Sequence, residues 1–270
     1  MSLLTDFGAA SPYPAEMRAV LRARCRATLV DITHDVPAHD VAFGAHMLAT
    51  AAPAFPAGTV HLAVVDPGVG TVRRPLVVTA GGHVFVGPDN GLLMVAARAL
   101  GSPAVFVLDV DRFARRPLSA TFHGRDLFAP AAAAIAEGLP PARTGTPLAT
   151  PVELEVKPAE QAAGVVRGRV LYCDAFGNAV TNIPGTWLRA LPGTVRLHGP
   201  AGDVLVRQVR AYGEGRPGEP LVLVGSSGTL EIAINTARAA DVLGLTAGQE
   251  ITIAAAHDAA MGGRAHDEGK

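Results

Sequence analysis

A chain of 270 residues with 49% hydrophobic and 17% charged side chains has enough apolar material for one large domain or two moderate ones, and it is too hydrophobic for a disordered or fibrous protein. Lysine and arginine number 23 and aspartate and glutamate 24, so a net charge of -1 gives no field that would draw the chain to nucleic acid or to an anionic membrane. A small-molecule partner is therefore expected.

Cysteine usage and the first residues predict a cytoplasmic protein. Cys25 and Cys173 lie in no Cys-x-x-Cys or Cys/His spacing, which fits a reducing compartment and predicts that no metal site is present. The first residues contain no basic segment followed by a long apolar run, and Asp6 would interrupt a signal sequence. No window reaches the roughly 18 to 20 apolar residues that a membrane span requires. A membrane is therefore not an expected partner, and the net charge of -1 gives no reason to expect a nucleic acid.

Residues 1–150 alternate between strand-like and helix-like patterns. Strands are predicted over 1–7, 28–32, 58–65, 75–79, 83–86 and 104–108, and helices over 14–26, 40–52, 92–100 and 127–137. The segments on either side of Gly81 and Gly82 are predicted to form a hairpin. Strands that alternate with helices indicate an α/β domain, with a mainly parallel sheet that is covered by helices on both faces.

The pattern changes after residue 150. Residues 151–164 are rich in Pro, Ala and Glu without apolar periodicity, so they are predicted to form a linker. Short strand-like segments then predict a smaller antiparallel β-barrel-like domain over 165–255, and residues 256–270 are predicted to be a flexible tail. The strands of this second domain are expected at 167–173, 194–197, 204–211, 220–224, 229–234 and 250–254, with one helical turn at 237–243.

Polar residues of the first domain follow its predicted strands. The strand at 58–65 leads into Asp66, Pro67 and a Gly-rich turn, and Arg73 stands seven residues beyond the aspartate. In an open α/β sheet, ligands bind in the crevice outside the carboxyl ends of the strands, so this carboxylate is placed like part of an active-site wall. An Asp-Pro-Gly sequence is also a common turn former, and the spacing alone leaves both interpretations open.

Seven short strings occur in order between residue 3 and about residue 245. They are Thr5-Asp6-Phe7-Gly8, Asp31-Ile32-Thr33-His34-Asp35-Val36-Pro37, Asp66-Pro67-Gly68-Val69-Gly70-Thr71 with Arg73-Arg74, Gly87-Pro88-Asp89-Asn90-Gly91-Leu92-Leu93, Thr121-Phe122-His123-Gly124-Arg125-Asp126, Phe176-Gly177-Asn178 with Thr181-Asn182-Ile183, and Gly225-Ser226-Ser227-Gly228 with Leu230-Glu231-Ile232. Each string alone is weak evidence. Together they resemble the S-adenosylmethionine (SAM) hydroxide adenosyltransferase family, also called SAM hydrolases, which are relatives of the fluorinating and chlorinating enzymes.

The resemblance implies a reaction and three catalytic residues. Water attacks C5′ of the ribose of SAM, and adenosine and L-methionine are the products; SAM is the substrate and no cofactor is implied. The family's catalytic Asp, Arg and His correspond to Asp66, Arg73 and His123. Arg73 would stabilise negative charge on the water, and the other two would orient it and receive or relay its proton. Arg74 competes with Arg73 for this role, and the seven-residue step from Asp66 favours Arg73.

Substrate-binding roles follow from the same resemblance. Asp6 corresponds to the carboxylate that accepts from the ribose hydroxyls. In the second domain, Tyr212 is expected to stack on adenine and the backbone near Ile234 to read its edge. The resemblance further implies a homotrimer in which the site lies at a subunit interface. The groups expected to hold the amine and carboxylate of methionine and the adenine edge are Asp174, Asn178, Ser226 and Glu231.

Two strings depart from the family pattern. Ser11 stands near a position where an Asp is expected, and after Ile234 the usual Gly-Ser-Ala-Ala is replaced by residues 235–240, which begin Asn-Thr-Ala-Arg. Both changes concern substrate contacts and leave the expected catalytic residues in place.

Other interpretations remain open from the sequence. Asp6 and Asp66 could be helix caps or turn formers, His123 a loop histidine, and Tyr212 part of the barrel core. Among functions, the alternatives are transfer of a halide to the same carbon, a non-catalytic adenosine or SAM sensor, and a metal-dependent phosphoesterase built from the Asp and His residues.

Overall fold

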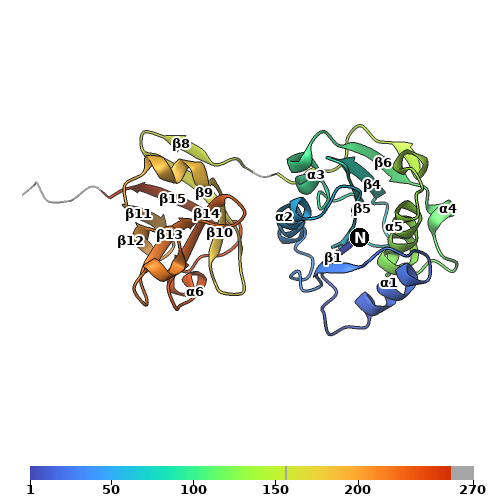
Figure 1. The fold of residues 1–270 in the computed structure, drawn as a ribbon, viewed down its shortest axis with the longest axis horizontal. Helices are drawn as coiled ribbons and strands as arrows, with labels where there is room; N and C mark the ends of the chain where they lie inside the picture. Colours follow the sequence, from blue (N-terminus) through green and yellow to red (C-terminus); the bar gives the residue numbers. More distant parts are fainter. Residues whose placement is uncertain (156, 257–270) are drawn as a thin grey trace, which may run out of the picture. The chain divides into compact units, whose positions relative to one another are not determined.

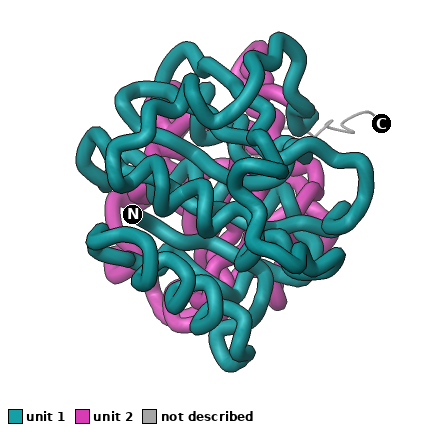
Figure 2. The backbone as a smooth tube through the Cα atoms, turned by 90° about the vertical axis from the view of Figure 1, so that its right-hand side faces the viewer, with its two compact units in different colours: residues 1–156 teal, residues 157–270 magenta. Residues whose placement is uncertain are grey.

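The structure of the protein is a computed structural model that describes residues 1–155 and 157–256. It divides into two compact units, Met1–Val156 and Lys157–Lys270, which are coloured separately in Figure 2. Of the expected tail at 256–270, residues 257–270 lie outside the described part of the chain.

The first unit is built around a seven-stranded sheet with the order β2-β1-β3-β5-β4-β6-β7. Strands β2, β1, β3 and β5 pair in parallel, and β4 pairs antiparallel with both β5 and β6. The predicted hairpin, β4 and β5, is confirmed. The strands are β1 (Ser2–Thr5), β2 (Val30–Thr33), β3 (Val60–Val64), β4 (Pro75–Ala80), β5 (His83–Pro88), β6 (Ala104–Leu108) and β7 (Gly145–Pro147).

Helices cover both faces of this sheet (Figure 1). Helices α1 (Tyr13–Arg22) and α5 (Ala129–Ala136) contribute to one core with Leu3, Leu62 and Val64. Helices α2 (Val41–Ala51) and α3 (Met94–Leu100) contribute to the other core with the strand neighbours Leu4 and Ala63. Successive strand residues point to opposite faces, so a strand with buried residues throughout, such as β1, is buried from both sides. The predicted α/β class is confirmed.

The remaining elements of the first unit are short. They are α4 (Val110–Phe113), the 3-10 turns η1 (Ala52–Ala54) and η3 (Pro141–Arg143), and a π-helical turn, η2 (Gly124–Phe128), that leads into α5. Single π-helical turns are rare and frequently accompany functional sites.

The second unit is a closed β-barrel with an additional strand. The pairing runs β10-β14-β13-β12-β11-β15-β9, and β9 pairs with β10 to close the barrel, while β8 pairs with β9. The apolar core includes Val166, Val195, Val222 and Ile232. The strands are β8 (Glu160–Ala162), β9 (Val165–Cys173), β10 (Ala179–Pro184), β11 (Thr194–Gly199), β12 (Gly202–Gln208), β13 (Pro220–Val224), β14 (Thr229–Ile234) and β15 (Glu250–Ala255), with 3-10 turns η4 (Gly185–Ala190) and η5 (Tyr212–Glu214) and helix α6 (Ala239–Leu243).

The observed boundaries of helices and strands agree best with the predicted boundaries where an apolar run lies between strong turn formers. The ranges of β6, β13 and β14 are those expected. Strands β7, β8 and β10 were not expected, and β8 lies within the segment 151–164 that the sequence marks as a linker. The expected helix at 127–137 begins instead as the π-helical turn η2.

Candidate functional site

Two carboxylates of the first unit follow neighbouring parallel strands. Asp6 comes directly after β1, and Asp66 comes two residues after the end of β3. Because β1 and β3 pair in parallel, with Thr5 opposite Val64, both carboxylates reach the same edge of the sheet. Both line a cavity of about 280 Å³ that His123 lines as well.

The turn after β3 depends on Gly70. Its φ of +75° lies in the left-handed region, and a Cβ atom at this position would lie 2.3 Å from the carbonyl oxygen of Ala120. Only glycine therefore allows the segment around Ala120 to lie directly on this turn. That close approach brings His123, three residues beyond Ala120, to the side chain of Arg73.

Arg73 joins the two other predicted catalytic residues. Its Nε donates to both carboxylate oxygens of Asp66, over 2.9 and 3.0 Å, and its Nη2 also donates to Oδ2. The same Nη2 lies 3.0 Å from Nδ1 of His123. The guanidinium stands 5.1 Å from the ring centroid of Phe128, which belongs to η2. The side chains of Asp66 and Arg73 are 5% and 10% exposed, so the pair is shielded from solvent.

The contact with Arg73 determines the state of His123. A guanidinium has donors only, so Nδ1 must accept, and a neutral ring then carries its proton on Nε2. Burial and the positive charge of Arg73 lower the pKa of His123 below 6.5, and the opposing effects of Asp66 and Asp126 are smaller. The imidazole is thus held neutral, with an N–H group that it can donate.

Asp6 is anchored by the backbone on the other side of the cavity. Its Oδ2 accepts from the amide of His39 over 3.0 Å, while Oδ1 accepts no hydrogen bond from the described residues. His39 has a φ of +67°, an uncommon conformation for a residue other than glycine, and it lines the same cavity. Sequence reasoning did not select His39, because nothing in its neighbours indicates a left-handed backbone.

An aromatic wall completes this cavity. Phe7, Tyr13 and Phe122 contact one another edge to face, with ring centroids 5.2 to 6.0 Å apart, and all three line the cavity. Sequence reasoning missed them as site residues. The signal was that Phe7 and Phe122 lie inside two of the seven strings and directly beside Asp6 and His123.

In the second unit, all six predicted substrate-binding residues line one cavity of about 530 Å³. They come from the loop after β9, from η5, from the turn between β13 and β14, and from β14 itself. The six residues are Asp174, Asn178, Tyr212, Ser226, Glu231 and Ile234.

The loop after β9 is shaped by its own aspartate. Oδ1 of Asp174 accepts from the amides of Phe176 and Asn178 over 2.9 and 2.8 Å, and Oδ2 accepts from Nδ2 of Asn178 over 3.0 Å. Much of the hydrogen-bonding capacity of this carboxylate is therefore spent within the loop.

Tyr212 and Glu231 are paired inside this cavity. The Tyr212 hydroxyl donates to Oε2 of Glu231 over 2.7 Å, and burial followed by this bond raises the pKa of Tyr212 above its usual value. The Glu231 carboxylate fits because Gly225 has no side chain: a Cβ atom there would lie 2.7 Å from the carboxylate carbon. Tyr212 is 42% exposed as a residue, so it does not belong to the barrel core.

The segment that departs from the family pattern also lines this cavity. Thr236 has a φ of +64°, and Arg238 donates from Nη1 to the carbonyl oxygen of Ala175 over 2.7 Å and from Nε to Asp241 over 2.8 Å. Arg238 thus lines a cavity that Asp174 and Glu231 line as well. Sequence reasoning named this segment only as a departure and assigned Arg238 no role.

Other polar residues of the strings support the architecture. Nε of Arg74 donates to Oδ2 of Asp89 over 2.6 Å, so the carboxylate partner of Arg74 is Asp89, whereas that of Arg73 is Asp66. His34 is buried and its Nδ1 lies 2.8 Å from the hydroxyl of Thr5, while Asp35 accepts from the amide of Ala9 over 2.7 Å. These contacts hold the ends of β1 and β4 in place.

Two kinds of feature are absent from the described part of the chain. Within 1–155 and 157–256, no group of three or more His, Cys, Asp or Glu side chains is arranged to hold a metal ion. No helix in the same ranges is sufficiently long and apolar to span a membrane.

Both units of the chain are similar to known proteins. The family model for the SAM hydroxide adenosyltransferase N-terminal domain matches residues 1–145, and that for the C-terminal domain matches residues 168–252. A protein of Salinispora tropica named (R)-S-adenosyl-L-methionine hydrolase is 43% identical over 259 residues, which are 94% of this chain and 97% of the relative. A fluorinase of an Actinoplanes species is more distant, at 24% identity over 94% of this chain and 96% of its own.

The fold has a close counterpart among solved structures. The crystal structure of an uncharacterized conserved protein from Thermotoga maritima superposes with a TM-score of 0.90 and 36% identity, and covers 94% of this chain and 99% of its own. The resemblance first inferred from seven short strings is thereby confirmed over nearly the whole length. On the evidence of both domain models and of relatives at this level of identity, the chain belongs to the SAM hydroxide adenosyltransferase family.

Proposed function

We propose that this protein hydrolyses SAM to adenosine and L-methionine. The oxygen of a water molecule forms a bond to C5′ of the ribose, the bond from C5′ to sulfur breaks, and the sulfur leaves with the electron pair as the thioether of methionine. One proton is released from the water. The observation that carries this proposal is the hydrogen-bonded group of Asp66, Arg73 and His123 beside Asp6 at the carboxyl ends of β1 and β3.

The chemistry requires little beyond positioning. A sulfonium departs as a neutral thioether, so the leaving group requires neither a general acid nor a Lewis acid. The attack on C5′ is slow because water is a weak nucleophile. The water must therefore be held in line behind C5′ and separated from bulk water. The aromatic wall of Phe7, Tyr13 and Phe122 supports this reading, because it gives the cavity an apolar side.

The three side chains have complementary roles in this proposal. Arg73 and the Nε2–H group of His123 donate to the water oxygen and favour its hydroxide character. Asp66 accepts one of its protons. The support for this division is the geometry: Nδ1 of His123 is engaged by Arg73, so in this arrangement the ring is a donor and the carboxylate is the remaining base.

Substrate binding is assigned to both cavities. Asp6 accepts from the ribose hydroxyls, Tyr212 stacks on adenine, and the backbone near Ile234 contacts the adenine edge. The polar ends of the substrate are assigned to Asp174, Asn178, Ser226 and Glu231. The support is that all six residues of the second unit line one cavity and that Asp6 lines the cavity of Asp66 and His123.

We further infer a homotrimer in which the cavity of the second unit in one subunit completes the cavity of the first unit in another. The resemblance to the family supports this assembly. The widely separated free cysteines, Cys25 and Cys173, support a cytoplasmic location. Because the relative from Salinispora tropica is named (R)-S-adenosyl-L-methionine hydrolase, the R epimer of SAM is the proposed substrate.

The activity is tested by incubating the purified protein with each sulfur epimer of SAM and separating the products by chromatography. Adenosine and methionine in equal amounts, formed from the R epimer, are the expected result. A halogenated adenosine formed when chloride or fluoride is added would replace this proposal with halide transfer, and bound but unchanged SAM would indicate a sensor. Activity lost with EDTA and restored by a divalent cation would indicate a metal-dependent enzyme.

The assembly is tested by subunit complementation. A His123→Ala variant lacks a residue of the first unit, and a Glu231→Ala variant lacks one of the second. If the site forms between subunits, mixed oligomers of these two inactive variants regain part of the wild-type activity, whereas a site within one subunit gives no recovery. Light scattering on the wild-type protein gives the subunit number.

A further inference from the structure

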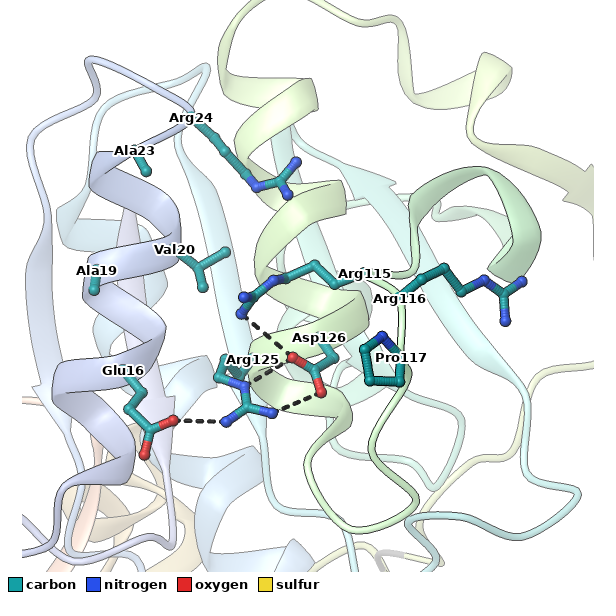
Figure 3. Close-up of a pocket in the computed structure, with 10 residues that line it drawn as sticks. All are labelled: Glu16, Ala19, Val20, Ala23, Arg24, Arg115, Arg116, Pro117, Arg125 and Asp126. Carbon is teal, nitrogen blue, oxygen red and sulfur yellow. Dashed lines mark hydrogen bonds and ion pairs between the residues drawn. The ribbon is translucent and has the colours of Figure 1, made fainter.

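A second cavity in the first unit carries an excess of positive charge. Its volume is about 570 Å³, and it is lined by one side of α1, by the segment 115–117 and by η2 (Figure 3). It shares no lining residue with the cavity that Asp6, Asp66 and His123 line. Four arginines and two carboxylates line it: Arg24, Arg115, Arg116, Arg125, Glu16 and Asp126.

The two carboxylates are already satisfied by a single arginine. Arg125 donates from Nε and Nη2 to the two oxygens of Asp126, over 2.7 and 2.8 Å, and from Nη1 to Glu16 over 2.7 Å. Asp126 also accepts from the amide of Ser119 over 3.1 Å. These bonds join Arg125 to both carboxylates, so Arg125 holds α1 against η2 and each of its three nitrogens already donates to a carboxylate.

The guanidinium groups of Arg24 and Arg115 remain largely free. The side chain of Arg24 makes no hydrogen bond or ion pair with any residue that the structure describes, and only its backbone amide is bonded, to the carbonyl oxygen of Leu21. The ion pair of Arg115 is a 3.4 Å contact with Asp126, an oxygen that Arg125 already reaches. Figure 3 shows the guanidinium groups of Arg24, Arg115 and Arg125 one after another along the side of α1.

Arg116 adds charge at the rim only. Its partner is Asp111, and the two side chains are 64% and 92% exposed, so this ion pair is weak and easily exchanged. In Figure 3 the Arg116 side chain extends away from the other three arginines.

The guanidinium groups of Arg24 and Arg115 are suited to binding phosphate. A guanidinium presents parallel N–H donors that fit two oxygens of one phosphoryl group, and two guanidinium groups in a row fit a ligand with more than one such group. We propose that this cavity, defined by Arg24, Arg115 and the wall of Ala19, Ala23 and Pro117, binds the polyphosphate portion of a small anion. This proposed site does not depend on hydrolysis of SAM, and a separate binding experiment tests it.

The probe is inorganic triphosphate, because it has no adenosine that could enter the other cavity. Isothermal titration calorimetry at low ionic strength is expected to give saturable binding to the wild-type protein. Arg24→Gln is expected to weaken this binding at least tenfold and the double variant with Arg115→Gln to abolish it. Binding is also expected to weaken as sodium chloride is raised, since the arginines are solvent-exposed.

Arg22→Gln is the matched control. Arg22 is the last residue of α1, is exposed, and lies two positions from Arg24 without lining the cavity. The substitution therefore removes the same charge from the same end of the helix as Arg24→Gln does. Its affinity for triphosphate is expected to stay within about twofold of wild type. Thermal melts by circular dichroism verify that all variants are folded, which is expected because the Arg24 side chain makes no hydrogen bond or ion pair with a described residue.

Three results would overturn the proposal. One is the absence of saturable binding to the folded wild-type protein at millimolar triphosphate. Another is an equal loss of affinity in Arg22→Gln and Arg24→Gln, which would indicate general electrostatic attraction to the positive charge of this surface and no defined binding site. The last is orthophosphate binding as tightly as triphosphate, which would indicate a site for a single phosphoryl group. None of these results depends on hydrolysis of SAM.

Discussion

Nη2 of Arg73 donates to Nδ1 of His123 across 3.0 Å, although 50 positions separate the two residues in the chain. One contact therefore ties the turn after β3 to the start of η2 and fixes the imidazole with its proton on Nε2. Since Arg73 also binds Asp66, a single guanidinium orients both of its neighbours.

The first prediction concerns the pKa of His123. Burial and, after it, the charge of Arg73 lower this pKa, so removing the charge in Arg73→Gln is expected to raise the pKa toward 6.5. An NMR titration of the imidazole measures the shift without depending on activity, and ¹⁵N shifts report the tautomer. A pKa that stays the same or falls in the variant would contradict this electrostatic assignment.

The second prediction separates the two adjacent arginines. Arg73→Ala is expected to reduce turnover by roughly 10² to 10⁴ while adenosine affinity stays within a few-fold, and His123→Ala should behave similarly. Arg74→Ala is expected to preserve turnover but to destabilise the fold by about 1–3 kcal/mol, because the buried Asp89 loses a partner. Steady-state kinetics and denaturant melts on both variants distinguish these outcomes; equal turnover in the two variants would remove Arg73 from the mechanism.

The third prediction tests how the site is assembled. Gly70→Ala is expected to lower both turnover and stability, the latter by about 1–3 kcal/mol, because its Cβ would meet the carbonyl of Ala120 and push away the segment that carries His123. Gly58→Ala is the control: Gly58 has a φ of +86° but no atom within 4 Å of the added carbon. It should lose about 1 kcal/mol of stability and keep its turnover. If Gly70→Ala keeps full turnover, the close approach does not position His123.

The fourth prediction concerns Asp6. Asp6→Ala is expected to weaken adenosine binding at least tenfold, because a carboxylate that accepts from two hydroxyls is lost. Asp6→Asn keeps an acceptor for the amide of His39 and should retain the loop structure while losing the charge. Calorimetry with adenosine measures both variants, and unchanged affinity in Asp6→Ala would reject the ribose role.

The fifth prediction concerns stability at low pH. His61 is fully buried between Ser2 and His83, at 2.7 and 3.0 Å, and burial followed by the charge of His83 lowers its pKa to about 4. The unfolded chain takes up this proton near pH 6.5, so between 6.5 and 4 the unfolded state binds more protons than the folded state. The free energy of unfolding should therefore fall as pH falls through that interval, by up to about 3 kcal/mol.

A His61→Phe variant checks the assignment of this pH dependence. Phenylalanine suits the stacked rings of Phe85 and His83 but cannot titrate. Denaturant melts between pH 4 and 7 should show a flatter dependence for the variant than for the wild type. The same slope in both proteins would place the effect on other groups.

Part of the site was readable in the sequence because its signals are local. An aspartate after an apolar run and before a Pro-Gly turn marks a strand end wherever it occurs, and this is where Asp66 lies. The strands β13 and β14 were also predicted with their observed bounds. By contrast, β10 was missed because Asn182 and Pro184 interrupt its apolar pattern, although four of its six residues are buried.

The sequence by itself determined the fold class, the family and the identity of the polar residues at the strand ends, because apolar periodicity, turn formers and short strings are properties of neighbouring residues. Only the tertiary structure decided which of them meet. It directed Arg73 to Asp66 and Arg74 to Asp89, and it brought Phe7, Tyr13 and Phe122 into one wall. The physical reason is that contacts between distant residues depend on strand order and on the close approach of separate loops, and neither is encoded in the local pattern.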